Sequence, residues 1–207
     1  MPAPNKEEVH AVLEPYHSKI RSVVVNAWEE WRTVSALRAQ NGLAPVLYSR
    51  TVSNDVFDAI ARGGISTFAI EPGVNLKIET QTFKLFFKGK VCARFKRGNE
   101  NKLGQNIPTQ AAIAFEEADG ELAGFPAHTA KVEIIWLAND LNTRLESVLV
   151  VARDGDRLLW EYEIEATPAA GAGTIITFPK PPTPPSDDDE NLITPKAPGT
   201  KKTGEGE

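Results

Sequence analysis

The fold is decided by one stretch of sequence, Thr82-Phe83-Lys84-Leu85-Phe86-Phe87-Lys88-Gly89-Lys90-Val91-Cys92-Ala93-Arg94-Phe95-Lys96-Arg97. Side chains alternate between the two faces of a β-strand, so this stretch predicts a hairpin with strands Thr82 to Lys88 and Lys90 to Arg97. One face of the hairpin is apolar and consists of Phe83, Leu85, Phe87, Val91, Ala93 and Phe95. The other face carries the cations Lys84, Lys88, Lys90, Arg94 and Lys96.

Helices are predicted before the hairpin. Residues 6–39 favour a helix with a break near Pro15, ended by Gly42 and Pro45, because apolar residues recur every three or four positions. The apolar stripe consists of Ile20, Val24, Ala27, Trp31, Val34 and Leu37. We interpret it as core, the more common use of such a pattern, and a partner-binding face that includes Trp28 and Trp31 is the alternative. A second helix is predicted from about Ser53 to Gly63-Gly64, followed by one or two short strands within residues 65–79.

Further elements are predicted after the hairpin. A polar loop over 98–106 leads into a helix near 108–118. Three strands then follow as a meander, namely Lys131 to Leu137, Arg144 to Ala152 and Leu158 to Glu165, with a tight turn at Asp154-Gly155. The sequence therefore predicts an α+β fold, in which N-terminal helices cover the apolar face of a mostly antiparallel sheet.

Length and composition indicate one domain and a tail. We expect a domain over 1–166, helical over about 6–64 and sheet-forming over about 65–166. Residues 167–207 are rich in Pro, Gly and charge, including Pro181-Pro182-Thr183-Pro184-Pro185 and Asp187-Asp188-Asp189-Glu190. Such a segment buries too little apolar surface to offset its ordering entropy, so we predict a mostly disordered tail.

Several kinds of chemistry are not expected. The single cysteine, Cys92, excludes an intramolecular disulfide and a cysteine-based zinc site. His10, His17 and His128 do not have metal-site spacing, and we expect no shared site for the first two, no cofactor and no catalytic residue. Without a signal peptide or an apolar run of about 20 residues, the chain is predicted to be cytoplasmic and not membrane-associated.

The charges separate along the chain. Residues 75–108 hold eight Lys or Arg against two Asp or Glu, whereas residues 109–178 hold four against twelve. A cationic hairpin face of this kind could bind a nucleic acid or another anion. The candidate residues are Lys84, Lys88, Arg94, Lys96, Arg97 and Lys102. The more common arrangement is that such cations pair across strands on one solvated face, here with Glu133, Glu161, Glu163 and Glu165.

Two further constellations are weaker. Asn106, Thr109 and Gln110 could present polar groups to a partner at the helix start, although capping of the helix is the more common role. A metal-dependent nuclease needs paired carboxylates near a lysine. Glu71 and Lys77-Ile78-Glu79 approach that pattern with the wrong spacing.

Parts of residues 50–165 resemble a family of small uncharacterised bacterial proteins. The likeness is carried by Arg94-Phe95-Lys96-Arg97, by Asn106-Ile107-Pro108-Thr109-Gln110 and by the strand that contains Trp160. The chain departs from the family at Trp136-Leu137-Ala138-Asn139, where the family has aromatic-x-Leu-Asn. The resemblance implies that the protein is encoded beside helix-turn-helix and ImmA/IrrE-type metallopeptidase genes in mobile-element or phage-response operons. It does not imply that the protein catalyses a reaction.

The sequence therefore predicts a non-enzymatic interaction or regulatory protein of a bacterial stress or phage-response module, similar to toxin–antitoxin systems. Its expected partner is a protein from the same operon, such as the helix-turn-helix or metallopeptidase protein. The alternatives are nucleic-acid binding through the basic hairpin face and, more weakly, a metal-dependent nuclease.

Overall fold

The structure is a computed structural model that describes residues 4–80, 82–105, 110–116, 126 and 129–166. The chain divides into two units, Met1–Ala169 and Ala170–Glu207, and all described residues belong to the first. The predicted tail over 167–207 lies outside the described residues.

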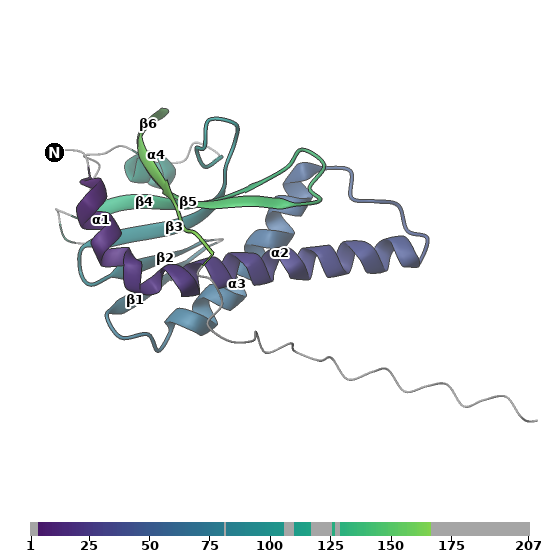
Figure 1. Cartoon of the computed structure of the whole chain (residues 1–207), viewed down its shortest axis with the longest axis horizontal. Helices are drawn as coiled ribbons and strands as arrows, with labels where there is room; N and C mark the ends of the chain where they lie inside the picture. The colour runs from purple at the N-terminus through teal and green to yellow at the C-terminus, as the bar shows by residue number, and fades with distance from the viewer. Residues whose placement is uncertain (1–3, 81, 106–109, 117–125, 127–128, 167–207) are drawn as a thin grey trace, which may run out of the picture. The chain divides into compact units, whose positions relative to one another are not determined.

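The N-terminal part is helical (Figure 1). It contains α1 (Lys6–Leu13), the 3-10 turn η1 (Glu14–Tyr16), α2 (His17–Gln40) and α3 (Ser49–Phe68). The Asn5 side chain caps α1 by accepting hydrogen bonds from the backbone N–H groups of Glu7 and Glu8. The predicted break near Pro15 is confirmed as η1.

The strands form one six-stranded sheet in the order β1 to β6. Their bounds are Val74–Glu79, Thr82–Phe87, Val91–Arg97, Ala130–Ala138, Leu145–Asp154 and Arg157–Glu163. All neighbours are antiparallel except β3 and β4, which are parallel and are joined by a crossover containing α4 (Gln110–Glu116). The predicted α+β class, hairpin and meander are thereby confirmed.

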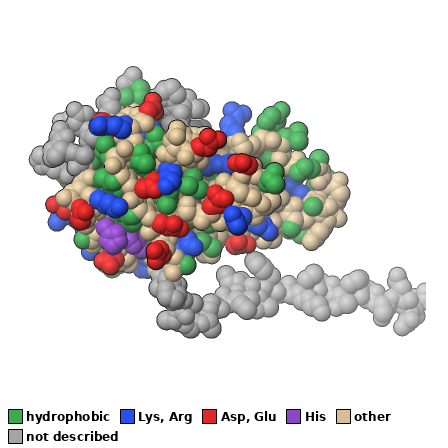
Figure 2. Space-filling model, turned by 45° about the horizontal axis from the view of Figure 1, so that its top comes forward, with side chains coloured by type: hydrophobic (Ala, Val, Ile, Leu, Met, Phe, Trp, Pro, Cys, Tyr) green, Lys and Arg blue, Asp and Glu red, His purple; other side chains and the backbone are tan. Residues whose placement is uncertain are grey.

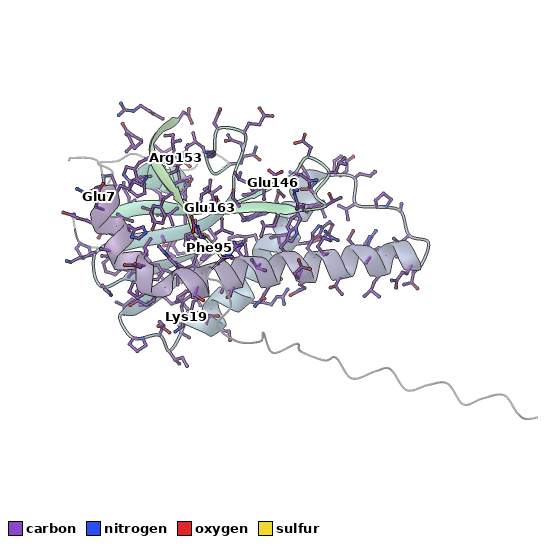
Figure 3. All side chains as sticks on the ribbon, viewed as in Figure 1. Glu7, Lys19, Phe95, Glu146, Arg153 and Glu163 are labelled. Atoms are coloured by element: carbon purple, nitrogen blue, oxygen red, sulfur yellow. The ribbon has the colours of Figure 1, made fainter. Side chains whose placement is uncertain are left out.

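The main core lies between the helices and the predicted apolar face of the hairpin. Phe83, Leu85, Phe87, Val91, Ala93 and Phe95 are all buried there with residues of α1, α2 and α3. The rings of Trp28 on α2 and Trp136 on β4 lie 5.9 Å apart, and Phe95 is labelled between sheet and helices in Figure 3. The helices thus cover one face of the sheet.

The middle of the opposite face is buried rather than solvated, so Arg94 pairs across the strands with Glu133 as expected, but in the interior. A second apolar cluster forms there from Leu103, Ile135, Leu149 and Val151. The loop over 98–105 crosses this face so closely that a Cβ on Gly98 would lie 2.3 Å from the Ile135 side chain. Backbone contact of this closeness is open only to glycine.

The predicted bounds of the second helix are wrong. Helix α3 begins at Ser49, four residues before the predicted cap, and Ser53 instead donates its hydroxyl to the Ser49 carbonyl. Gly63-Gly64 does not end the helix, which continues to Phe68. The reason is tertiary packing, because the Phe83 ring lies against Gly64, where a Cβ would come within 2.8 Å of its Cζ.

Alanine substitution at these two neighbouring glycines is expected to change the stability of the protein in opposite directions. A Cβ on Gly63 meets only ordinary contact, 3.8 Å from Val23, so Gly63→Ala should stabilise the protein by roughly 0.5–1 kcal/mol through helix propensity. Gly64→Ala overpacks the buried Phe83 ring and should destabilise by about 1–3 kcal/mol. Urea denaturation measures the change in the free energy of unfolding for each variant. Equal changes for the two variants would contradict the packing described for α3.

Candidate interaction surface

Arg94, a predicted anion-binding residue, belongs to a buried charge cluster on the second face of the sheet. Its Nε and Nη2 donate to Oε1 of Glu133 at 3.0 and 2.6 Å, and Nη2 also donates to Glu116 at 3.0 Å. Parallel pairing places Arg94 directly opposite Glu133. The guanidinium stacks on the Phe115 ring of α4, 4.1 Å from its centroid, so this cation is already engaged by two carboxylates and an aromatic ring.

Arg153 of β5 completes the cluster (Figure 3). Its Nη1 donates to the Gly104 carbonyl at 3.0 Å and lies 3.6 Å from both Glu133 and Glu116. The Gly104 N–H in turn donates to Oε2 of Glu133 at 3.0 Å. The cluster therefore fastens the loop over 98–105 and α4 to the sheet, and its role is structural.

The other cations of the hairpin are divided between different environments. Lys84 pairs with Glu79 at 2.8 Å, and Lys102 pairs with Glu161 of β6. Lys88 lies in the β2–β3 turn with its ammonium 5.8 Å from the centre of the Tyr16 ring, on the helix side. Lys96 is partly buried beside Arg94, and burial, followed by repulsion from Arg94, lowers its pKa.

Arg97 also points to the helix side, where it joins three elements. It donates to the Ser49 carbonyl and the Ser53 hydroxyl at the start of α3, and to Asn142 in the β4–β5 connection at 2.7 Å. Its guanidinium lies 5.3 Å from the Trp136 ring centre, and burial lowers its pKa. The structure therefore brings Arg94 and Lys96 together but separates them from Lys88 and Arg97.

The remaining predicted positions lie outside the described residues, lack a described side chain or are engaged in ion pairs. Asn106 and Thr109 lie outside the described residues, and Gln110 begins α4 without a described side chain. Glu71 pairs with Lys19, and Glu79 pairs with Lys77 and Lys84. Among the described residues, no group of three or more His, Cys, Asp or Glu side chains could hold a metal ion.

His10 and His17 lie together, although the sequence spacing did not lead us to expect a shared site. Their rings are 5.1 Å apart edge to face, and Nε2 of His17 lies 3.1 Å from the Tyr162 hydroxyl of β6. The seven-residue spacing across η1 is two helical turns, which is the signal the sequence contained. The histidines join the start of α2 to the edge strand, and burial raises the pKa of Tyr162.

This junction is expected to make the stability of the protein pH-dependent. Burial, followed by the charge of His10, lowers the pKa of His17 from 6.5, and Glu14 opposes this shift. A lowered histidine pKa means that the unfolded chain binds the proton better, so the contribution of His17 is present above pH 6.5 and is lost as pH falls below it. The urea concentration at the unfolding midpoint should therefore fall as the pH is lowered from about 7.5 to 5.5, and it should fall less steeply for His17→Gln than for the unaltered chain. If the midpoints of the two proteins fell equally with pH, His17 would not be the cause of the pH dependence.

The most exposed apolar surface lies where α2 ends. We call residues Arg32–Tyr48 the α2 arm; it comprises the last turns of α2 and the connection to α3. Large apolar side chains are exposed along it, namely Val34, Leu37, Leu43, Leu47 and Tyr48. Figure 2 shows hydrophobic side chains gathered on this side of the molecule. The predicted core stripe of α2 is therefore wrong at its end, because Val34 and Leu37 extend past the sheet.

The α2 arm has a defined backbone. Gly42 adopts a positive φ of 68°, its N–H bonds to the Ala39 carbonyl, and the Leu43 N–H bonds to the Arg38 carbonyl. These two hydrogen bonds form the Schellman motif, which commonly brings the residue after the glycine against the last turn of the helix. Arg38 also donates to the Ala44 carbonyl at 3.2 Å. These contacts fix the backbone around Leu43 at the end of α2.

The α2 arm and the first residues of α3 carry positive charge and no acidic residue. Residues 32–54 contain Arg32, Arg38 and Arg50 and no acidic residue, in a protein of net charge −5. Arg32 donates to the Thr143 carbonyl and ties the arm to the β4–β5 connection. The surface is therefore apolar and locally cationic.

Comparison with protein-family models, with curated proteins and with solved structures finds no match to this chain. Within the residues that the structure describes, no helix has the length and apolar character needed to cross a bilayer.

Proposed function

We propose that this chain is a non-enzymatic interaction protein that binds another protein through the α2 arm. The observation that carries the proposal is the exposure of five large apolar side chains on one connected segment, with Leu47 at 81% and Tyr48 at 74% exposed. Apolar patches of this kind on a folded domain typically mark contact sites for other proteins. The hydrogen bonds at Gly42, Leu43 and Ala44 fix this part of the arm and lower the entropy cost of binding there.

The chemistry of the α2 arm selects the kind of partner. Arg32 and Arg38 in the arm, and Arg50 just beyond it, favour an apolar segment flanked by acidic residues. Binding nucleic acid through Arg94, Lys84 and Lys102 would instead require phosphates to displace Glu133, Glu79 and Glu161 from these cations. The geometry therefore supports protein binding better than the nucleic-acid alternative.

The biological setting follows from the resemblance alone. It suggests a regulatory role in a bacterial stress or phage-response module, with a partner encoded in the same operon. The products of the neighbouring genes, including any helix-turn-helix or metallopeptidase protein, are accordingly the partners to test first.

Substitutions in the α2 arm are expected to abolish binding without unfolding the chain. Leu37→Asp combined with Leu47→Asp should weaken the complex at least about 100-fold, because both side chains would be buried in it. Arg50→Glu should slow association and reduce its dependence on salt. Each neighbouring gene product is titrated by calorimetry against the full chain and its variants.

Ile70→Asp is the matched control, since Ile70 is 89% exposed at the other end of α3 and should leave affinity unchanged. The proposal fails if no neighbouring gene product binds. It also fails if a bound protein is insensitive to the Leu37 and Leu47 changes.

A further inference from the structure

The edge strand β1 presents backbone groups that no described strand pairs. Beyond β1 the sheet has no further strand among the described residues. The Lys88 N–H donates to the Gly73 carbonyl at 2.7 Å, so this opposite pair is a hydrogen-bonded one. Because such pairs alternate, Asn75, Lys77 and Glu79 direct their backbone groups to β2. Val74, Leu76 and Ile78 therefore direct theirs outward.

An exposed apolar side chain lies on this open edge. Ile78 is 62% exposed, beside Lys77 and Glu79, whose charged groups lie 3.3 Å apart. Edge strands with free backbone groups and apolar side chains readily add another strand. The charges on either side of Ile78 are, in addition, opposite in sign. An antiparallel copy of the strand can therefore set Glu79 opposite Lys77.

Antiparallel registers centred on each of residues 74 to 78 let the outward groups of two β1 strands meet. The registers centred on Val74 and Asn75 do not set Lys77 opposite Glu79. A register centred on Lys77 places two lysines opposite each other, which is repulsive. A register centred on Leu76 places Lys77 opposite Asn75 and leaves Glu79 without a cation across the strand. A register centred on Ile78 packs Ile78 against its copy and sets Lys77 opposite Glu79 twice, in the pairs where side chains approach most closely.

We propose that β1 pairs with β1 of a second copy of this chain in the register centred on Ile78, which joins two sheets into one about a twofold axis. The axis makes the contact isologous, so each favourable pair occurs twice. Lys77 and Glu79 of both copies form one row of alternating charge. The edge is distinct from the α2 arm, and this inference does not depend on the proposed function.

The interface is short, so the dimer is expected to be weak and concentration-dependent. Sedimentation equilibrium of the full chain from about 10 µM to about 1 mM should show the mass rising from 22.6 kDa toward twice that value. Lys77→Glu should weaken the dimer at least about tenfold, because it sets carboxylates opposite each other. The double variant Lys77→Glu with Glu79→Lys should restore it, because the charges across the twofold axis are opposite again and the carboxylate at position 77 lies directly opposite Lys84 of β2.

Controls separate this edge from other contacts. Ile78→Thr keeps a β-branched residue but removes apolar surface, and it should also weaken the dimer at least about threefold. Leu47→Asp should leave the dimer unchanged. The inference is overturned if the chain stays monomeric throughout, if Lys77→Glu has no effect, or if Leu47→Asp is the change that dissociates the dimer.

Discussion

Replacing Phe95 with alanine is expected to lower the free energy of unfolding by about 3–5 kcal/mol. Phe95 is fully buried at the centre of the hairpin's apolar face, and its ring stacks on Phe83 with centroids 5.4 Å apart. Removing the ring would leave a cavity between sheet and helices that neighbouring side chains cannot fill without leaving their own contacts. Urea denaturation with an unchanged m-value measures the loss.

Phe86 provides a control from the same hairpin. It lies opposite Cys92 on the second face of the sheet and is only partly buried. Phe86→Ala should therefore cost clearly less, at most about 2 kcal/mol. If the two substitutions had equal effects, the assignment of the main core to one face of the hairpin would be wrong.

The hairpin shows why much of the fold can be predicted from sequence. Alternation over Thr82–Arg97 is a local signal, and it places Phe83, Leu85 and Phe95 on the correct face. The meander strands follow from the same rule, and the turn at Gly155 from its need for a positive φ. The parallel pairing of β3 with β4 depends on contacts distant in sequence, and no local pattern encodes it.

Tertiary packing accounts for the incorrect predictions. Gly63-Gly64 has poor helix propensity, yet α3 continues because Gly64 gives room to the Phe83 ring. The charged face was expected to be solvated, whereas the loop over 98–105 covers it. Both outcomes depend on which segments, distant in sequence, come into contact. The hydrophobic periodicity of the sequence does not encode those contacts.

The exposure of the α2 arm could not be predicted from the sequence. Val34 and Leu37 continue the helical stripe of α2, and periodicity alone cannot show that α2 extends past the sheet it covers. Apolar residues in the connection, such as Leu47 and Tyr48, were the available signal, since connections are usually polar. The structure is needed to decide which part of an amphipathic helix remains exposed.

Replacing Glu133 with glutamine is expected to destabilise the protein by about 3–5 kcal/mol, although the change preserves shape. Glu133 is completely buried and bonds to Arg94, while Arg153 lies 3.6 Å away. Without its charge, the two buried guanidinium groups keep only the partly exposed Glu116 in common, and Arg153 keeps in addition the fully exposed Asp156 at 3.4 Å. Glu163→Gln on exposed β6 is the control and should change stability by at most about 0.5 kcal/mol.

A double-mutant cycle shows whether the cost comes from the pair or from the loss of any one contact. Arg94→Met alone leaves Glu133 with Arg153 and the Gly104 N–H, so it should cost less than Glu133→Gln. The double variant removes both the cation and the carboxylate, and its cost should fall at least about 1 kcal/mol short of the sum of the single changes. Strict additivity would show that Arg94 and Glu133 contribute independently. The loop over 98–105 would then be held by Arg153 and Gly104 without help from the pair.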